Sequence, residues 1–166
     1  MTSEFRFEIR RAGPTDAEDA FHLIDEYYRE IGVLVRDGPS ELEQYLLGEQ
    51  SGIWLAHRLD PESRAIGCIL LRPLPQVHGA GEIKRLYVRQ SDRGAGVAQA
   101  LLLALEQYAS SRGLQWLYLD SKDDLQAALR FYQRSGYRPC DRYNENPQAT
   151  VFMRKQLQAA APARLK

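Results

Sequence analysis

The stretch Arg89-Gln90-Ser91-Asp92-Arg93-Gly94-Ala95-Gly96-Val97-Ala98 follows an apolar, strand-like run at 83–88 and leads into a run with helical periodicity. Gly94 and Gly96 have no Cβ, so the main chain there can adopt positive φ and approach a ligand closely. The free N–H groups of the first helical turn point to the same place, where the helix dipole favours negative charge. The stretch therefore predicts a cradle for a pyrophosphate-bearing cofactor, with Arg93 supplying a guanidinium suited to phosphate.

A second block lies farther along the chain. Ala128–Tyr137 reads Ala-Leu-Arg-Phe-Tyr-Gln-Arg-Ser-Gly-Tyr, a helical stretch that ends in a Gly-aromatic turn. The first block contains Arg-x-x-Gly-x-Ala at 93–98, after the strand-like Glu82–Val88. In this order and at this separation, the two blocks resemble the acetyl-CoA loop and the late helix of the GNAT superfamily of N-acetyltransferases. A Gly-rich loop alone would be weak support, but the two blocks together are strong, and the flanking elements fit from Phe5 to about Gln156.

The resemblance implies acetyl-CoA as co-substrate, and the sequence contains no cluster of metal-ligand residues, so we expect no metal. In the superfamily, main-chain N–H groups of the loop hold the pyrophosphate, and two strands that splay apart expose backbone groups to the pantetheine arm. Carried over to this chain, the cofactor-binding residues are Leu86, Tyr87, Val88, Arg93, Gly94, Ala95, Gly96, Val97 and Ala98. The chain departs from the family pattern at Gln90, which replaces a common proline, and at Ala98, which replaces a second glycine. Leu125 replaces an asparagine that contacts CoA, which puts one cofactor hydrogen bond in doubt.

The resemblance also implies that the acetyl group passes directly from the thioester to an amine. An alkyl amine has a pKa near 10.4, so at neutral pH its proton must be taken, directly or through water. The superfamily often uses a carboxylate at the start of the fourth strand, here Glu82. The alternatives are an ordinary solvated glutamate and a water chain to another acid. Tyr132 matches the tyrosine that protonates the departing thiolate in many members, although its spacing from Leu125 and Leu129 also suits a core residue.

The superfamily places its acceptor pocket between the first two helices and the loop that joins the last strands. The substrate-binding candidates there are Tyr28, Arg36, Tyr143 and Asn144, with Tyr27, Val33 and Arg142 nearby. Aromatic, Arg and Asn side chains suit a small polar amine that carries a carboxylate, such as an amino acid or its derivative. Any exposed loop contains such residues, so the acceptor and the acyl-chain preference stay open.

Composition narrows the class of partner. Over 166 residues, 22 basic residues balance 22 acidic ones and the pI is near 6.8, so no overall field would attract nucleic acid or an anionic membrane. The start of the chain has no signal-peptide core, and no run approaches the ~20 apolar residues of a membrane span. Two cysteines and three scattered histidines form no metal-ligand pattern, and reduced thiols are expected. We therefore expect a cytoplasmic protein whose partner is a small-molecule amine. The resemblance allows a homodimer, which nothing in the sequence requires.

The order of elements predicts an α/β (α+β) fold. We expect a central mixed, mostly antiparallel sheet of about six or seven strands flanked by about four helices. The expected strands cover 5–10, 53–57, 65–72, 82–88, 116–120, 137–140 and 150–154. Capping-box spacing places the first two helix starts at Thr15 and Ser40, and Asp123 or Asp124 is expected to cap the last helix. The length predicts a single domain over 1–166, which the resemblance implies is acetyltransferase-like, with a core at about 5–157 and a flexible tail at 158–166.

Two other functions fit parts of the sequence. A non-catalytic acyl-CoA-binding module would keep the cradle and use bound CoA to regulate a partner. A dinucleotide-binding Rossmann unit fits less well, because the G-x-G-x-x-G spacing and an early βαβ unit are missing. The favoured interpretation is an acetyl-CoA-dependent N-acetyltransferase that acts on a small amine, with the CoA-binding module as the alternative.

Overall fold

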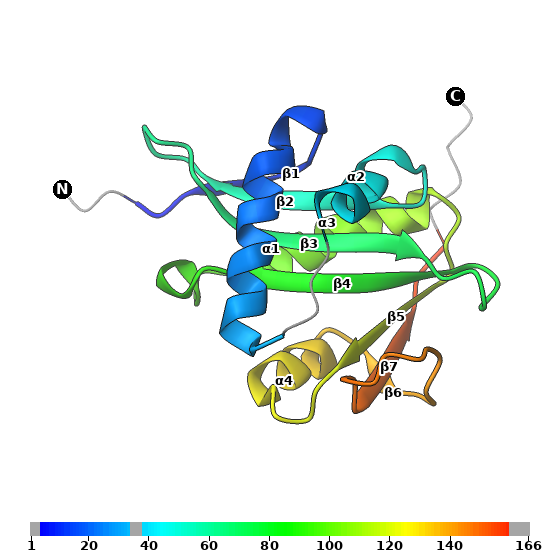
Figure 1. Cartoon of the computed structure of the whole chain (residues 1–166). Coiled ribbons are helices and arrows are strands. Elements are labelled where there is room, and N and C mark those ends of the chain that lie inside the picture. Colours follow the sequence, from blue (N-terminus) through cyan, green and yellow to red (C-terminus); the bar gives the residue numbers. More distant parts are fainter. Residues whose placement is uncertain (1–3, 34–37, 160–166) are drawn as a thin grey trace.

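Seven strands form one mixed sheet in the computed structural model, which describes residues 4–33 and 38–159 (Figure 1). The strands are β1 (Phe7–Arg11), β2 (Gly52–Arg58), β3 (Ala65–Pro73), β4 (Ala80–Val88), β5 (Trp116–Ser121), β6 (Arg138–Pro139) and β7 (Val151–Gln156). The helices of the described residues are α1 (Ala17–Ile31), α2 (Pro39–Leu47), α3 (Val97–Ser111) and α4 (Gln126–Arg134), with 3₁₀ turns η1 (Pro14–Asp16) and η2 (Gln90–Asp92). The strand order is β1-β2-β3-β4-β5-β7-β6, and only β4 and β5 run parallel. The predicted mixed, mostly antiparallel sheet with flanking helices is confirmed.

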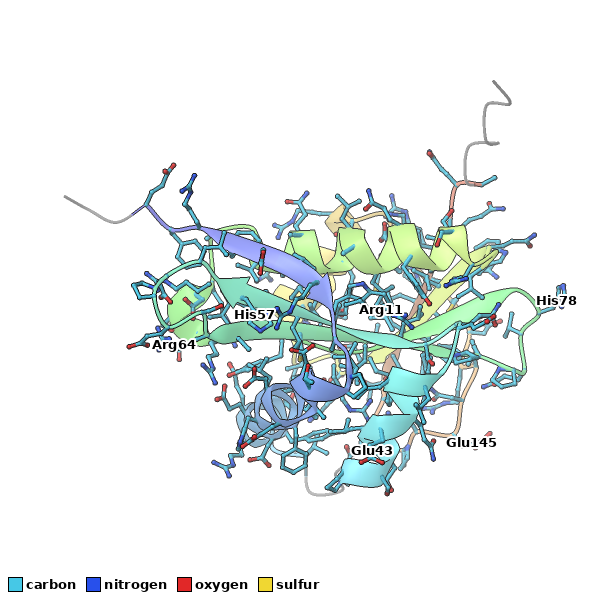
Figure 2. The ribbon with its side chains drawn as sticks, turned by 90° about the horizontal axis from the view of Figure 1, so that it is seen from above. Arg11, Glu43, His57, Arg64, His78 and Glu145 are labelled. Atoms are coloured by element: carbon cyan, nitrogen blue, oxygen red, sulfur yellow. The ribbon has the colours of Figure 1, made fainter. Side chains whose placement is uncertain are left out.

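Helices cover both faces of the sheet. Figure 2 shows α3 on one side of the sheet and α1 and α2 on the other. Because successive side chains of a strand point to opposite faces, β2 contributes to both cores. Trp54 and Ala56 pack on the α3 side, and Ile53 and Leu55 pack on the side of α1 and α2. Tyr132 of α4 joins the α3-side core. The central strands are thus buried on both faces, and they give the neighbouring β4 a rigid support.

An irregularity in β4 opens the sheet. Its register against β3 shifts by one residue between Lys84 and Tyr87, which is a β-bulge. Arg85, inside the bulge, has φ +53°, a left-handed conformation that is uncommon for a residue with a Cβ. On its other edge β4 pairs with β5 only as far as Ile83, which lies opposite Leu119. Beyond that point β5 turns away from β4 (Figure 1), and a wedge opens between the two strands.

The helix starts differ from the expected ones. Gly13–Pro14 opens the first helical segment and Gly38–Pro39 opens the second, with proline at a position that needs no N–H donor. A carboxylate three residues after each glycine, Asp16 or Glu41, accepts a hydrogen bond from the glycine N–H. α4 begins at Gln126 without a side-chain cap. The predicted caps at Thr15, Ser40, Asp123 and Asp124 are therefore wrong.

Candidate active site

The main chain before α3 forms an open cradle. Gly94 (φ +86°) and Gly96 (φ +84°) adopt the left-handed backbone, and Gly96 is the N-cap of α3. Within the described part of the chain, no acceptor takes a hydrogen bond from the N–H groups of 94–98. A Cβ added at either glycine would meet no atom within 4 Å, so both positions face open space. The segment fits a pyrophosphate, which would receive hydrogen bonds at a helix N-terminus.

Arg93 is turned toward α1. Its Nη2 lies 2.8 and 2.7 Å from the two carboxylate oxygens of Glu30, and its Nε donates to the main-chain oxygen of Val88 at 2.8 Å. The Arg93 guanidinium, which the sequence analysis expected to bind phosphate, is therefore paired with the Glu30 carboxylate. The favourable potential at the cradle comes from the N–H groups and the helix dipole instead.

The predicted pantetheine-binding residues lie on the open edge of β4. Leu86 borders a cavity, the Tyr87 hydroxyl donates to Glu26 at 3.3 Å, and Val88 is buried. Because β5 does not pair with β4 beyond Ile83, this edge of the strand offers its backbone groups to a ligand. The open edge of β4 thus borders the cavity at Leu86 and continues along the chain toward the turn at 90–92 and the cradle.

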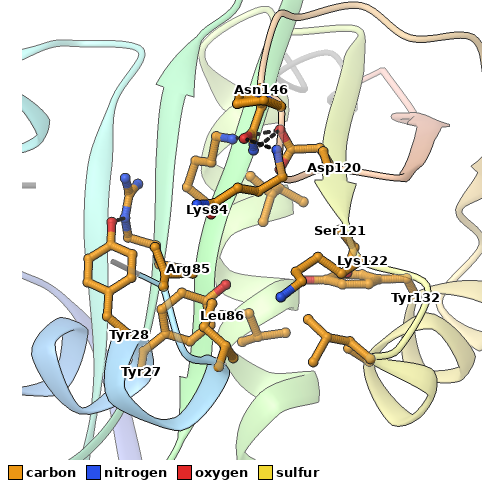
Figure 3. Close-up of a pocket in the computed structure, with 18 of the residues that line it drawn as sticks. Tyr27, Tyr28, Lys84, Arg85, Leu86, Asp120, Ser121, Lys122, Tyr132 and Asn146 are labelled. Atoms are coloured by element: carbon orange, nitrogen blue, oxygen red, sulfur yellow. Dashed lines mark hydrogen bonds and ion pairs between the residues drawn. The ribbon is translucent and has the colours of Figure 1, made fainter. Parts of the chain in front are cut away.

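A cavity of about 510 Å³ lies at the wedge (Figure 3). It is bounded by α1, the second half of β4, the end of β5, the start of α4 and the loop 146–149. The polar and charged side chains that line it are Tyr27, Tyr28, Glu41, Lys84, Arg85, Asp120, Ser121, Lys122, Tyr132, Asn146 and Gln148. Acidic, basic and aromatic groups therefore meet in a cavity that the open edge of β4 borders at Leu86.

Tyr132, which the resemblance implies lies near the departing thiolate, lines this cavity from α4. Its side chain is 7% exposed, and no residue in the described part of the chain forms a hydrogen bond with its hydroxyl. Burial raises the pKa of Tyr132 above its ordinary value, and the nearby Tyr27 and Asp120 raise it further. The phenol therefore stays protonated and can donate its proton into the cavity.

Asp120 is a cavity residue that the sequence interpretation missed. Lys84 Nζ (3.0 Å), Asn144 Nδ2 (2.7 Å) and Asn146 Nδ2 (3.3 Å) all donate to its Oδ2. Within the described residues nothing donates to Oδ1. Burial acts to raise the pKa of Asp120, but the Lys84 ammonium and the three hydrogen bonds outweigh it and lower the pKa. The group is an ionised carboxylate with one oxygen available to a ligand.

Glu82, the predicted base, lies behind the cavity wall. It is fully buried, and Arg72 donates to its Oε1 through Nε (2.7 Å) and Nη2 (2.6 Å). Tyr143 OH (2.7 Å) and Asn144 Nδ2 (3.1 Å) donate to Oε2. Lys84 Nζ lies 3.5 Å from the same oxygen, so within the described residues Glu82 is joined to the cavity through Lys84 and, by way of Asn144, through Asp120. A network connects it to Asp120, without direct access to a ligand.

The predicted acceptor-binding residues do not all lie at the cavity. Tyr28 lines the cavity, and its hydroxyl accepts a hydrogen bond from Arg85 Nε at 2.5 Å. Tyr143 and Asn144 belong to the network behind the wall, and burial and the Glu82 carboxylate raise the pKa of Tyr143. Arg36 lies outside the described residues. Lys122 was not predicted, and Figure 3 shows its side chain extending into the cavity from the end of β5.

Other kinds of site were sought over the same residues. Between residues 4 and 33 and between 38 and 159, no three His, Cys, Asp or Glu side chains converge so that they could hold a metal ion. Within those ranges, no helix has both the length and the apolar character needed to cross a bilayer. Cys68 is buried and Cys140 is partly buried, and both are free thiols.

Comparisons with known proteins agree with this geometry. Residues 17–137 match the Acetyltransferase (GNAT) family. An uncharacterized N-acetyltransferase of Schizosaccharomyces pombe is 32% identical over 149 residues, which cover 87% of this chain and 90% of that protein. A GNAT-family acetyltransferase of Staphylococcus aureus has a TM-score of 0.79 at 18% identity, covering 92% of this chain and 100% of its own. The PaiA N-acetyltransferase of Thermoplasma acidophilum, solved with coenzyme A, has a TM-score of 0.67 at 19% identity over 91% of this chain and 99% of its own.

The two solved structures support the fold, and the family match together with the yeast relative supports the activity. The matched residues include the cradle, the wedge and Tyr132. The chain therefore belongs to the GNAT acetyltransferase family, and it is an N-acetyltransferase that moves an acyl group from acyl-CoA to an amine.

Proposed function

We propose that the protein transfers an acetyl group from acetyl-CoA to the primary amine of a small molecule by direct attack. The observation that carries the proposal is that the open edge of β4, whose chain continues into the cradle at 94–98, borders at Leu86 a cavity that Tyr132 and Asp120 both line. Acetyl-CoA supplies the activated acyl group. The residues of the chain hold the cofactor, orient the amine and handle two protons.

The cradle and β4 supply the cofactor contacts. The N–H groups of Gly94, Ala95, Gly96, Val97 and Ala98 bind the pyrophosphate, and the open edge at Leu86, Tyr87 and Val88 takes the pantetheine arm. Arg93 contributes by fixing the turn through Glu30 and Val88. No metal takes part in this scheme.

Asp120 receives the acceptor amine. Asp120 lines the cavity and its Oδ1 has no donor among the described residues, so we assign the N–H of the amine to this oxygen. Because the pKa of Asp120 is lowered, it is a weak base toward a free ammonium, whose pKa is near 10.4. The amine therefore enters in its neutral form, and Asp120 accepts the proton as the new C–N bond makes that nitrogen acidic.

Glu82 acts on this step through the network. It orients Lys84 and Asn144, which fix the Asp120 carboxylate. Were Glu82 itself the base, Glu82→Gln would flatten the acidic limb of the kcat/KM pH profile. In the proposed scheme Asp120 contacts the amine instead. The acidic limb of the profile then follows the pKa of the acceptor amine, so it should persist in Glu82→Gln.

Tyr132 is proposed as the acid. When the C–S bond breaks, a thiolate leaves, and the Tyr132 hydroxyl is a protonated donor in the same cavity. A thiol has a pKa near 8.5, so transfer from a phenol is uphill and works within a hydrogen bond, where donation and bond breaking occur together.

The cavity favours a small acceptor that carries a negative group. Its volume of about 510 Å³ must hold the end of the cofactor arm and the acceptor together. Lys122 lines it and has no carboxylate partner in the described residues, while Arg85 adds a second cation at the wall. An amino acid or its derivative would place its amine at Asp120 and its carboxylate toward these cations.

Thiol release from acetyl-CoA with a panel of amines and amino acids tests the proposal. We expect amine-dependent release and a product heavier by one acetyl group. Tyr132→Phe should lower kcat by about ten- to a thousandfold with CoA binding retained. Unchanged kcat would remove Tyr132 from the mechanism. Binding of acetyl-CoA without turnover of any amine would support the regulatory acyl-CoA-binding module instead.

A further inference from the structure

Two carboxylates of α1 hold the two arginines that flank η2. Glu26 and Glu30 lie one helical turn apart and therefore project from the same face of the helix. Glu26 accepts hydrogen bonds from Arg89 Nε (3.0 Å) and Nη2 (2.8 Å), one on each carboxylate oxygen. Glu30 accepts from Arg93 Nη2 at 2.8 and 2.7 Å. Both ends of the turn that leads into the cradle are thus tied to α1.

Aromatic contacts extend this connection to the cavity. The Tyr87 hydroxyl donates to Glu26 at 3.3 Å, and the Arg93 guanidinium lies 5.8 Å from the centroid of the Tyr87 ring. The ring centroids of Tyr27 and Tyr87 lie 6.2 Å apart in an edge-on arrangement, and Tyr27 lines the cavity. A contiguous set of contacts therefore runs from the cradle through α1 to the acceptor side.

The charges of this cluster cancel in pairs. Each guanidinium faces a carboxylate, so the two arginines add little net positive potential for a phosphate. The Glu26–Arg89 side chains are 35% and 30% exposed, and a pair exposed to that degree contributes little to global stability. What the pair does provide is geometry, because two hydrogen bonds in a planar fork fix the direction of the Arg89 side chain and of the turn that it begins.

We propose that Glu26 is a positioning residue for acyl-CoA: by holding Arg89 it sets the turn that presents the N–H groups of 94–98, and it couples that turn to α1. This inference rests on the proposed function only in taking the cradle as the acyl-CoA site. It predicts that Glu26 governs cofactor affinity although it touches no ligand.

Charge reversal separates positioning from simple electrostatics. Glu26→Arg brings a positive charge toward the phosphates, which by electrostatics alone would tighten CoA binding. Positioning predicts the opposite, about fivefold or more weaker binding, because two guanidinium groups now face each other. Arg89→Glu should weaken binding as well, and the double variant Glu26→Arg with Arg89→Glu should restore most of the affinity. Glu18→Arg is the matched control, since Glu18 lies on α1 and, among the described residues, pairs only with His22 of its own helix.

The measurement is calorimetric titration of CoA into each full-length variant, with thermal unfolding to confirm that each is folded. Hydrogen exchange adds a second measurement, whose result would not change if Glu26 only stabilised the fold. CoA should slow amide exchange in α1 of the wild-type protein, and this protection of α1 should be lost in Glu26→Gln, which keeps the size of the side chain. Tighter or unchanged CoA binding in Glu26→Arg, or no recovery in the double variant, would overturn the inference. Absence of CoA binding in the wild-type protein would instead overturn the proposed function.

Discussion

Asp120 illustrates how chemistry at the scale of one residue depends on neighbours that are remote in sequence. Its three donors come from β4 and from the loop before β7, and all of them occupy Oδ2. In the proposed scheme the other oxygen, Oδ1, which has no donor among the described residues, binds the amine. At this scale the carboxylate is both ionised and pre-oriented, which is what a group that receives an amine requires.

Replacement of Asp120 tests this role. Asp120→Asn keeps the shape of the side chain and removes the charge, so kcat/KM should fall by about a hundredfold or more, the range of general-base contributions. The matched control is Asp123→Asn, because Asp123 is an exposed carboxylate outside the cavity. Steady-state kinetics of thiol release provide the measurement. Equal activity of the two variants would show that Asp120 does not handle the amine.

Site residues that belong to a local sequence motif could be predicted. Those whose surroundings come from hydrogen bonds between distant segments could not. Tyr132, which lines the cavity, could be predicted because its spacing from the Gly-aromatic turn lies within one continuous stretch of sequence, a helix and its end. Asp120 is one acid at the end of an apolar strand, and nothing local distinguishes it from a solvated side chain. Glu82 was chosen for its place in a strand, but Arg72 and Tyr143, from other elements, enclose it.

At the scale of elements, the site is a consequence of how β4 meets its neighbours. The bulge at Arg85 and the end of pairing with β5 at Ile83 together create the wedge. The sequence predicted the strand and the following loop, because alternation and paired glycines are local signals. The family resemblance implied that two strands splay apart, but the bulge itself was not predicted, since Arg85 has no residue-type signal for positive φ.

Close packing between β3 and β4 should therefore matter for cofactor binding as well as for stability. A Cβ at Gly67 would lie 2.9 Å from the Tyr87 main-chain oxygen and 3.3 Å from the Val88 side chain. Gly67→Ala should push the end of β4 away and lower the unfolding free energy by about 1–3 kcal/mol. Gly13→Ala is the control, because a Cβ there meets nothing within 4 Å. Denaturant titration compares the two, and equal stability would mean that β4 has room to move.

At the scale of the whole molecule, one buried histidine links stability to pH. His57 in β2 is 3% exposed, its Nδ1 has no partner in the described residues, and Arg10 lies 3.4 Å from Nε2, where it can only donate. Burial and then the Arg10 charge lower the pKa of His57, although Asp16, Asp19 and Glu8 act in the opposite direction.

A pKa that is lower in the folded state means that the unfolded chain binds the proton more readily. The contribution of His57 is therefore fully present above its unfolded pKa of about 6.5, and it is lost as the pH falls from there toward the lower folded value. We expect the Tm to fall between pH 7.5 and 5.5, and to fall less in His57→Gln, which does not titrate. Thermal unfolding of the wild-type protein and of His57→Gln across this pH range tests the expectation. Parallel pH dependence in the two proteins would assign the effect to other groups.

The whole fold was more predictable than the site. The sheet, the helices on both faces and the cradle follow from periodicity and glycine placement over contiguous stretches, and these are properties that one sequence displays. The helix starts were wrong because Gly-Pro pairs determined them instead of the capping-box spacing at Thr15 and Ser40. The acceptor side could not be predicted in the same way, because α1, β4, β5 and the loop 146–149 meet there only after folding.

The central claim is that the segment 94–98 binds the pyrophosphate of acetyl-CoA, and calorimetric titration of acetyl-CoA tests it most directly. Gly96→Glu places an anion in the cradle, whereas Gly113→Glu places the same side chain on a glycine of nearly equal φ (+82°), also open to space, at the other end of α3. The two variants share the backbone strain and differ only in position. We predict saturable binding to the wild-type protein and to Gly113→Glu, and no binding to Gly96→Glu. Equal binding by both variants, or no binding by the wild-type protein, would contradict the account.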